Sequence, residues 1–256
     1  FEPTLRTVRD IANANLALSN GYLLEPQALI DTLHESTDAP VVEVADAAST
    51  RGATLVPLVE DVSLDAIWLG LRISGAAQHS SGVDFRMVSA DGPGDVAAYV
   101  VSAFGTPEVL FNSADGVDGK EDAVTLPANA HTHVSWGFSQ PGIYRLGFQA
   151  EGTEVQHLTV AVGVNPPKGM QAIDSGHLDI EANLAQHRID LRDQDKRFDP
   201  ATTAVSIPSS VLQPIPPDPA YRFLGAPGSD TYLLPQAVLG KHIHGEVDPH
   251  LWHNVD

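Results

Sequence analysis

The sequence contains no cysteine, which excludes disulfide bonds, thiolate metal ligands and cysteine nucleophiles. It is also poor in basic residues, with 14 Lys and Arg against 33 Asp and Glu and a formal net charge of −19. A field of that sign repels phosphate backbones and anionic lipid, and it raises the local concentration of cations. Nucleic acid is therefore not an expected partner, although solubility alone accounts for the charge equally well.

Long apolar runs and catalytic motifs are missing too. No run approaches the ~20 apolar residues that a membrane-spanning helix needs. The chain has no Gly-x-Ser-x-Gly elbow, no phosphate-binding glycine-rich loop and no His-Glu-x-x-His helix. Ser, His and Asp are abundant, but no spacing fixes them as a triad. We therefore expect no enzyme activity from this chain.

The first part of the chain alternates helix and strand patterns. Residues 4–12 have the apolar spacing of a helix, and residues 16–19 read as a short strand. A second helix is expected from Pro26, and residues 41–44 read as the next strand. Strand, helix and strand at this spacing predict a parallel βαβ unit of an α/β fold.

The pattern changes from about Ala48. Short apolar or alternating runs recur between Gly, Asp and Pro, which favours a large, mainly antiparallel β-sandwich of immunoglobulin-like type. The runs are residues 66–73, 96–104, 108–111, 134–138, 143–148 and 155–164. Residues 165–169 resemble a linker, and the Pro-rich residues 207–219 predict extended loop rather than helix.

The last segment is rich in histidine. His242 and His244 alternate, so in an extended loop they point the same way and can bind one ion together. Asp248-Pro249 can form a helix-entry turn that leaves His250 near the start of a helix. A solvated loop that happens to contain histidines explains the same pattern equally well.

A second group of histidines lies in the β-rich part. His131 and His133 are expected on one face of a strand, and His177 can join them in space. Trp136 and Phe138 follow with the same two-residue spacing, so a packed sheet face is the simpler interpretation. A second metal or cofactor site at these three histidines remains the alternative hypothesis.

Both ends of the chain resemble a known family. Residues 1–4 read Phe-Glu-Pro-Thr, residues 15–21 end in Asn-Gly and are followed by Glu25, and residues 244–252 read His-Gly-Glu-Val-Asp-Pro-His-Leu-Trp. These stretches resemble motifs of the cluster A-I receptors, which serve bacterial ABC transporters for zinc and manganese. In that family the histidine of an Asp-Pro-His motif is a metal ligand, and the resemblance assigns this role to His250.

The resemblance also implies what this chain lacks. His242 and His244 sit where zinc receptors often carry a mobile His-rich loop. The first family ligand would precede Phe1 by two positions, and the later ligands would follow Asp256. One of the family's four ligands therefore falls within the chain, and we expect this site alone to bind metal poorly.

The middle of the chain resembles a β-rich module of actinobacterial surface-anchored proteins. The matching stretches are residues 92–97, 111–116, 131–138, 141–144, 176–179 and 220–228. Such modules occur inserted in the first lobe of some receptors. We therefore expect residues 1–49 and 237–256 to belong to the N-terminal lobe of the receptor. Residues 50–236 would form the insertion, with a sub-boundary near residues 165–172.

The resemblance implies the solute-binding component of a metal-ion ABC transporter, extracellular, at the cell surface or anchored to the membrane. It would capture zinc or manganese and deliver the ion to the transporter permease. The extra histidines favour zinc, because imidazole suits zinc whereas manganese prefers oxygen ligands. The alternative is a cell-surface interaction module whose β-rich insert binds a wall component or a partner protein.

Overall fold

The computed structural model describes residues 5–21, 25, 27–52, 66–75, 82–101, 106–194 and 196–234. These residues fall into two compact units, an N-terminal unit within residues 1–60 and a β-module within residues 61–241. None of the described helices is long and apolar enough to cross a membrane. The predicted receptor and insertion boundaries stay predictions.

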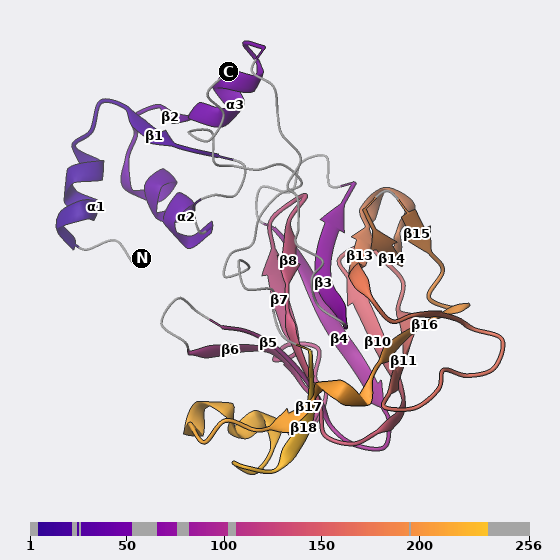
Figure 1. The fold of residues 1–256 in the computed structure, drawn as a ribbon. Helices are drawn as coiled ribbons and strands as arrows, with labels where there is room; N and C mark the ends of the chain where they lie inside the picture. Colours follow the sequence, from indigo (N-terminus) through magenta and orange to yellow (C-terminus); the bar gives the residue numbers. More distant parts are fainter. Residues whose placement is uncertain are drawn as a thin grey trace. The chain divides into compact units, whose positions relative to one another are not determined.

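The N-terminal unit has the expected βαβ order. Its elements are α1 (Leu5–Ala12), β1 (Ala17–Ser19), α2 (Gln27–Ser36), β2 (Val41–Glu43) and α3 (Val44–Ser49). β1 and β2 pair in parallel, which confirms the predicted connection through a helix (Figure 1). The carboxylate of Glu25 accepts hydrogen bonds from the backbone N–H groups of Asn20 at 2.6 Å and Gly21 at 3.3 Å, and so fixes the turn after β1. A complete receptor lobe remains a prediction.

The described part of the β-module forms three sheets (Figure 1). The first has the order β12 (Gln171–Ile173), β16 (Thr203–Ile207), β11 (Gln156–Val162), β10 (Gly142–Ala150), β4 (Val83–Asp91) and β7 (Ala123–Leu126). The second has the order β15 (Lys196–Phe198), β14 (Arg188–Asp193), β13 (Gly176–Asn183), β3 (Ile67–Ser74) and β8 (His131–His133). The third has the order β17 (Leu212–Pro214), β18 (Asp230–Leu234), β9 (Ser135–Phe138), β5 (Val96–Val101) and β6 (Pro107–Asn112).

This architecture confirms the β-rich prediction at a coarse level. Most strand pairs are antiparallel, as a sandwich requires, and the immunoglobulin-like arrangement stays a prediction. The pairs β3–β13, β11–β16 and β12–β16 are parallel, which the spacing of the runs did not indicate. The Pro-rich residues 207–219 contain no α-helix, and the short 3₁₀ turn η2 (Ser209–Val211) precedes β17. Two further 3₁₀ turns are η1 (Leu184–Gln186), between β13 and β14, and η3 (Pro219–Leu224), between β17 and β18.

An aromatic cluster forms much of the core between the sheets. Trp136 of β9 lies with its ring centroid 6.2 Å from that of Phe111 and 6.1 Å from that of Phe148, and all three are buried. The indole Nε1–H of Trp136 donates to the carbonyl oxygen of Leu69 at 2.9 Å. This bond connects the third sheet to β3 of the second sheet.

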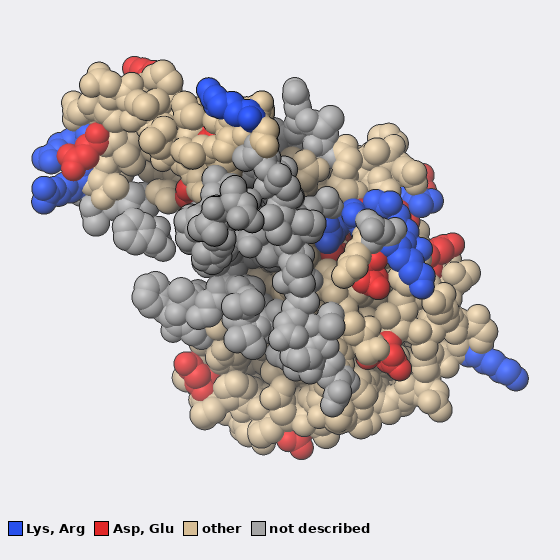
Figure 2. All heavy atoms as spheres, turned by 45° about the horizontal axis from the view of Figure 1, so that its top comes forward, with Lys and Arg blue, Asp and Glu red and all other residues tan. Residues whose placement is uncertain are grey.

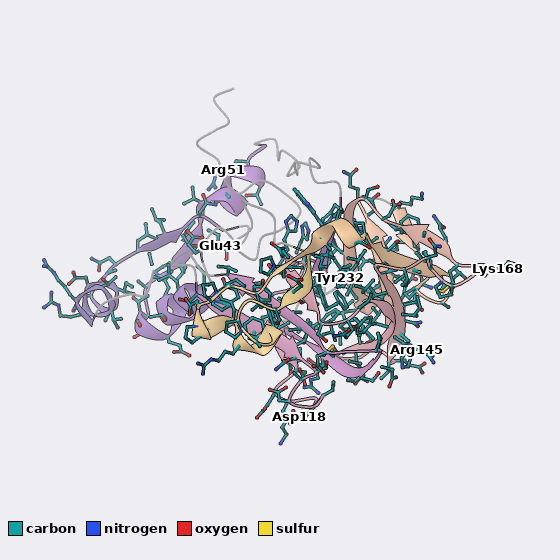
Figure 3. All side chains as sticks on the ribbon, turned by 60° about the horizontal axis from the view of Figure 1, so that its bottom comes forward. Glu43, Arg51, Asp118, Arg145, Lys168 and Tyr232 are labelled. Carbon is teal, nitrogen blue, oxygen red and sulfur yellow. The ribbon has the colours of Figure 1, made fainter. Side chains whose placement is uncertain are left out.

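Several charged side chains lie on the outside of the module. Lys168 and Arg145 project away from the strands, and Asp118 lies at the end of the loop between β6 and β7 (Figure 3). Asp118 accepts hydrogen bonds from two backbone N–H groups of its own loop, so it has a structural role there. Basic and acidic side chains lie near one another on the face drawn in Figure 2.

Candidate metal centre

The second sheet has one apolar and one polar face, because side chains alternate along each strand. In β3 the apolar face carries Leu69, Leu71 and Ile73, which are all buried. The register places Gly70 opposite Asp179 of β13 on one side and opposite His133 of β8 on the other. The polar face of the three strands carries His131, His133, Gly70, Arg72, His177, Asp179 and Glu181.

His131, His133 and His177 form a cluster on this face, called the His cluster below. The ring centroids lie 4.9 to 5.0 Å apart. One nitrogen of each ring falls within 4.8 Å of the corresponding nitrogens of the other two, and all three residues are buried. Neutral imidazole nitrogen is a common ligand of transition metals. The His cluster can therefore hold a metal ion.

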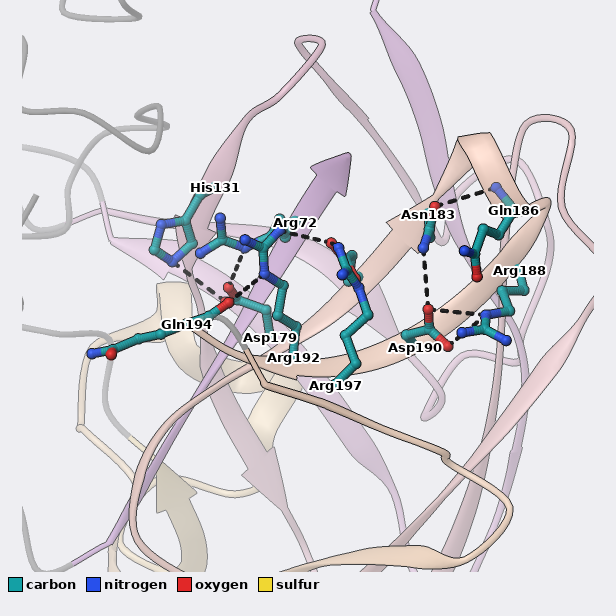
Figure 4. Close-up of polar contacts among 11 residues, drawn as sticks. Arg72, His131, Asp179, Asn183, Gln186, Arg188, Asp190, Arg192, Gln194 and Arg197 are labelled. Atoms are coloured by element: carbon teal, nitrogen blue, oxygen red, sulfur yellow. Dashed lines mark hydrogen bonds and ion pairs between the residues drawn. The ribbon is translucent and has the colours of Figure 1, made fainter. Parts of the chain in front are cut away.

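Asp179 borders the His cluster on β13. Its Oδ1 lies 3.1 Å from Nε2 of His177 and 3.4 Å from Nε2 of His131, and those two nitrogens are 3.1 Å apart. Its Oδ2 accepts a hydrogen bond from Arg72 Nε at 2.7 Å (Figure 4). Two ring nitrogens and one carboxylate oxygen thus form a nearly equilateral triangle.

The Asp179 carboxyl group is ionised although it is fully buried. Burial opposes ionisation, but the neighbouring His131 and His177 outweigh it and hold the pKa of Asp179 well below its ordinary value. The ion pair with Arg72 is buried too, with side chains 7% and 0% exposed. A carboxylate at the edge of a group of imidazoles provides the negative charge that a bound cation needs.

Farther along the same face, ion pairs replace histidines. Glu181 accepts hydrogen bonds from Arg197 at 2.7 Å and 3.0 Å and from Arg192 at 3.0 Å. Asp190 pairs with Arg188 and accepts a bond from Asn183, as Figure 4 shows. Guanidinium groups bind the carboxylates of Glu181 and Asp190, so these ion pairs stabilise the sheet. The candidate metal ligands on this face are therefore the His cluster and Asp179.

Gly70 leaves the space that the Asp179 carboxylate occupies. A Cβ atom at residue 70 would overlap Asp179 Oδ1 and would lie 2.9 Å from the carbonyl oxygen of Thr132. Glycine within a strand often marks such a close approach. The small residue at this position therefore lets Oδ1 lie beside the ring nitrogens of His131 and His177.

The variant Gly70→Ala tests this positioning. We expect zinc affinity to fall at least about 10-fold, which is the size of effect that displacing an orienting group has in metal sites. The reason is that the new methyl group moves Oδ1 while every histidine stays in the chain. Isothermal titration calorimetry on wild type and variant measures the change, with Gly119→Ala as a control because its added Cβ meets open space. Equal affinities in wild type and Gly70→Ala would contradict this role.

The structure describes one of the two predicted groups of site histidines. It brings His131, His133 and His177 together, as the alternative hypothesis required. Trp136 and Phe138 do not continue the same row, because the chain passes from β8 of the second sheet to β9 of the third sheet at Val134. His242, His244 and His250 lie outside the described residues. Comparisons with protein-family models, curated proteins and solved structures find no match to this chain.

Sequence reasoning did not select Asp179, Arg72 or Gly70. A signal was present, because His177 and Asp179 have the two-residue spacing of one strand face. Gly70 interrupts an apolar strand, which is a known sign of close approach. The parallel pairing of β13 with β3 places Asp179 opposite Gly70, and the sequence did not predict that pairing.

Proposed function

We propose that this protein binds one transition-metal ion at the His cluster of its β-module. The observation that carries this proposal is the convergence of His131, His133 and His177, from two strands that flank β3, on one buried point. Neutral imidazole nitrogens are common transition-metal ligands, and three of them within 4.8 Å of one another suit a single ion.

Zinc is the metal that these ligands favour. Zinc takes imidazole nitrogen at about 2.0–2.1 Å in tetrahedral sites, and manganese prefers more oxygen ligands. A tetrahedron with such bonds has ligand-to-ligand distances of about 3.3–3.4 Å. The distance of 3.1 Å between Nε2 of His131 and Nε2 of His177 is close to that value. The ligand nitrogen of His133 lies within 4.8 Å of those of His131 and His177.

The wider role is metal-ion capture outside the cell. The motifs at both ends of the chain resemble cluster A-I receptors, and the net charge of −19 favours the approach of cations. In this role the protein serves an ABC transporter permease and breaks no bond. His250 would bind the cargo ion, and the His cluster would be a separate site of the module.

The proposal is tested by measuring zinc and manganese binding to chelator-treated protein by calorimetry. Wild type is expected to bind about one zinc ion tightly, and His131→Ala or His177→Ala to lose more than about 100-fold in affinity, since even outer-shell changes cost 10–100-fold. His157→Ala is the matched control, because His157 lies in β11 of the first sheet.

The outcomes separate the two sites. Tight binding that survives His131→Ala and His177→Ala but is lost in His250→Ala would overturn the His cluster as the binding site. Binding lost in the cluster variants and unchanged in His250→Ala supports it. Absence of tight binding in wild type would remove the proposal altogether.

A further inference from the structure

We propose that Asp179 is the fourth ligand of this ion, so that the β-module holds a closed centre of three histidines and one aspartate with a resident ion rather than exchangeable cargo. The inference rests on the proposed function, since it presumes that the His cluster binds metal. What is added to the proposed function is a fourth ligand and the assignment of a closed, structural type of site.

His131 Nε2, His177 Nε2 and Asp179 Oδ1 form a triangle with sides of 3.1, 3.1 and 3.4 Å. The point in its plane that is equidistant from the three atoms lies about 1.9 Å from each of them. An ion with bonds of about 2.0–2.1 Å fits just out of this plane. The fourth position then belongs to His133.

Protons on the two ring nitrogens do not account for this triangle. If both Nε2 atoms carry hydrogen, both can point at Oδ1, but the two N–H groups then face each other across 3.1 Å. If one Nε2 is bare, its lone pair faces the negative Oδ1. No arrangement of protons on these two ring nitrogens makes all three sides of the triangle attractive, whereas one cation in its centre does.

The two oxygen atoms of the Asp179 carboxylate differ in their hydrogen bonds. Oδ2 is bound by Arg72, while Oδ1 accepts no hydrogen bond of regular geometry from the described residues although it is fully buried. A buried carboxylate oxygen left in this state costs free energy. Metal coordination through Oδ1 removes that cost, and Arg72 then acts as the positioning residue that orients the carboxylate.

Four protein ligands leave no position for water, which separates structural from catalytic zinc sites. The side chains of His131 and His177 are only 4% and 5% exposed, and that of Asp179 is 0% exposed. An ion held in this way exchanges slowly. It therefore suits a module that needs the ion for its own structure better than a receptor that must release it to a permease.

The test uses the intact protein loaded with Co²⁺, whose visible absorption reports coordination number, and azide as a probe for an open position. The wild-type spectrum is expected to be intense, as for four-coordinate Co²⁺, and unchanged by azide. Asp179→Asn is expected to become azide-sensitive and to release zinc to excess EDTA at least about 10-fold faster. The control His157→Ala, whose ring belongs to β11 of the first sheet, is expected to keep the wild-type spectrum and to remain azide-insensitive.

Each result decides one question. Azide binding to wild type, or equal spectra and release rates for wild type and Asp179→Asn, would overturn Asp179 as a ligand while leaving the His cluster as a metal site. Failure of wild type to bind Co²⁺ or zinc would instead overturn the proposed function. If Asp179→Asn does not fold, the wild-type azide result and the double variant Arg72→Met/Asp179→Asn, in which both charges of the pair are removed, still give the answer.

Discussion

Saturating zinc is expected to raise the melting temperature of the metal-free protein by about 10 °C. A ligand that binds only the folded state at 1,000 times its Kd stabilises it by about 4.1 kcal/mol. For domains of about 150–250 residues each kcal/mol corresponds to about 2–4 °C. The structural reason is that the ligands His131 and His177 are 46 residues apart in sequence and lie on strands that flank β3.

Differential scanning calorimetry with and without zinc measures this shift. The double variant His131→Ala/His177→Ala is expected to melt at the same temperature in both conditions, because it lacks two of the ligands. His157→Ala should behave like wild type, since its ring is in the first sheet. A zinc-dependent shift that persists in the double variant would place the stabilising ion elsewhere in the chain.

The His cluster was predictable from the sequence only in part. The two-residue spacing of His131 and His133 predicts that both lie on one face of a strand, and the structure has both in β8. Periodicity is a local property, so it specifies which residues share a face but not which strands become neighbours. The convergence with His177 depends on the antiparallel β3–β8 pair and the parallel β3–β13 pair, which join distant segments.

The local elements of the N-terminal unit were easier to predict. The helix and strand patterns before residue 48 match α1, β1, α2 and β2, because each carries its own apolar spacing or turn residues. The parallel β1–β2 pair followed from the short helical connection between them. The parallel strands of the β-module have no such connection, so antiparallel pairing was the natural expectation for them.

Trp136→Ala is expected to destabilise the β-module by about 3–5 kcal/mol, the usual cost of truncating a buried aromatic residue. That is a large part of the 5–15 kcal/mol that stabilises a typical domain. Trp136 is fully buried, and its ring contacts Phe111 and Phe148 in the aromatic cluster. Urea denaturation monitored by far-UV circular dichroism measures the loss.

Trp136→Phe separates packing from hydrogen bonding. Phenylalanine keeps most of the ring contacts but cannot donate to the Leu69 carbonyl, so we expect a cost of about 1–3 kcal/mol. Leu69 precedes Gly70, which lies between Asp179 and His133 in the sheet. Weaker support of β3 should therefore also lower zinc affinity, by less than the loss expected for Gly70→Ala. Unchanged stability in Trp136→Phe would show that the two sheets are held together by packing alone, and the site would then owe its geometry to the strand register rather than to this bond.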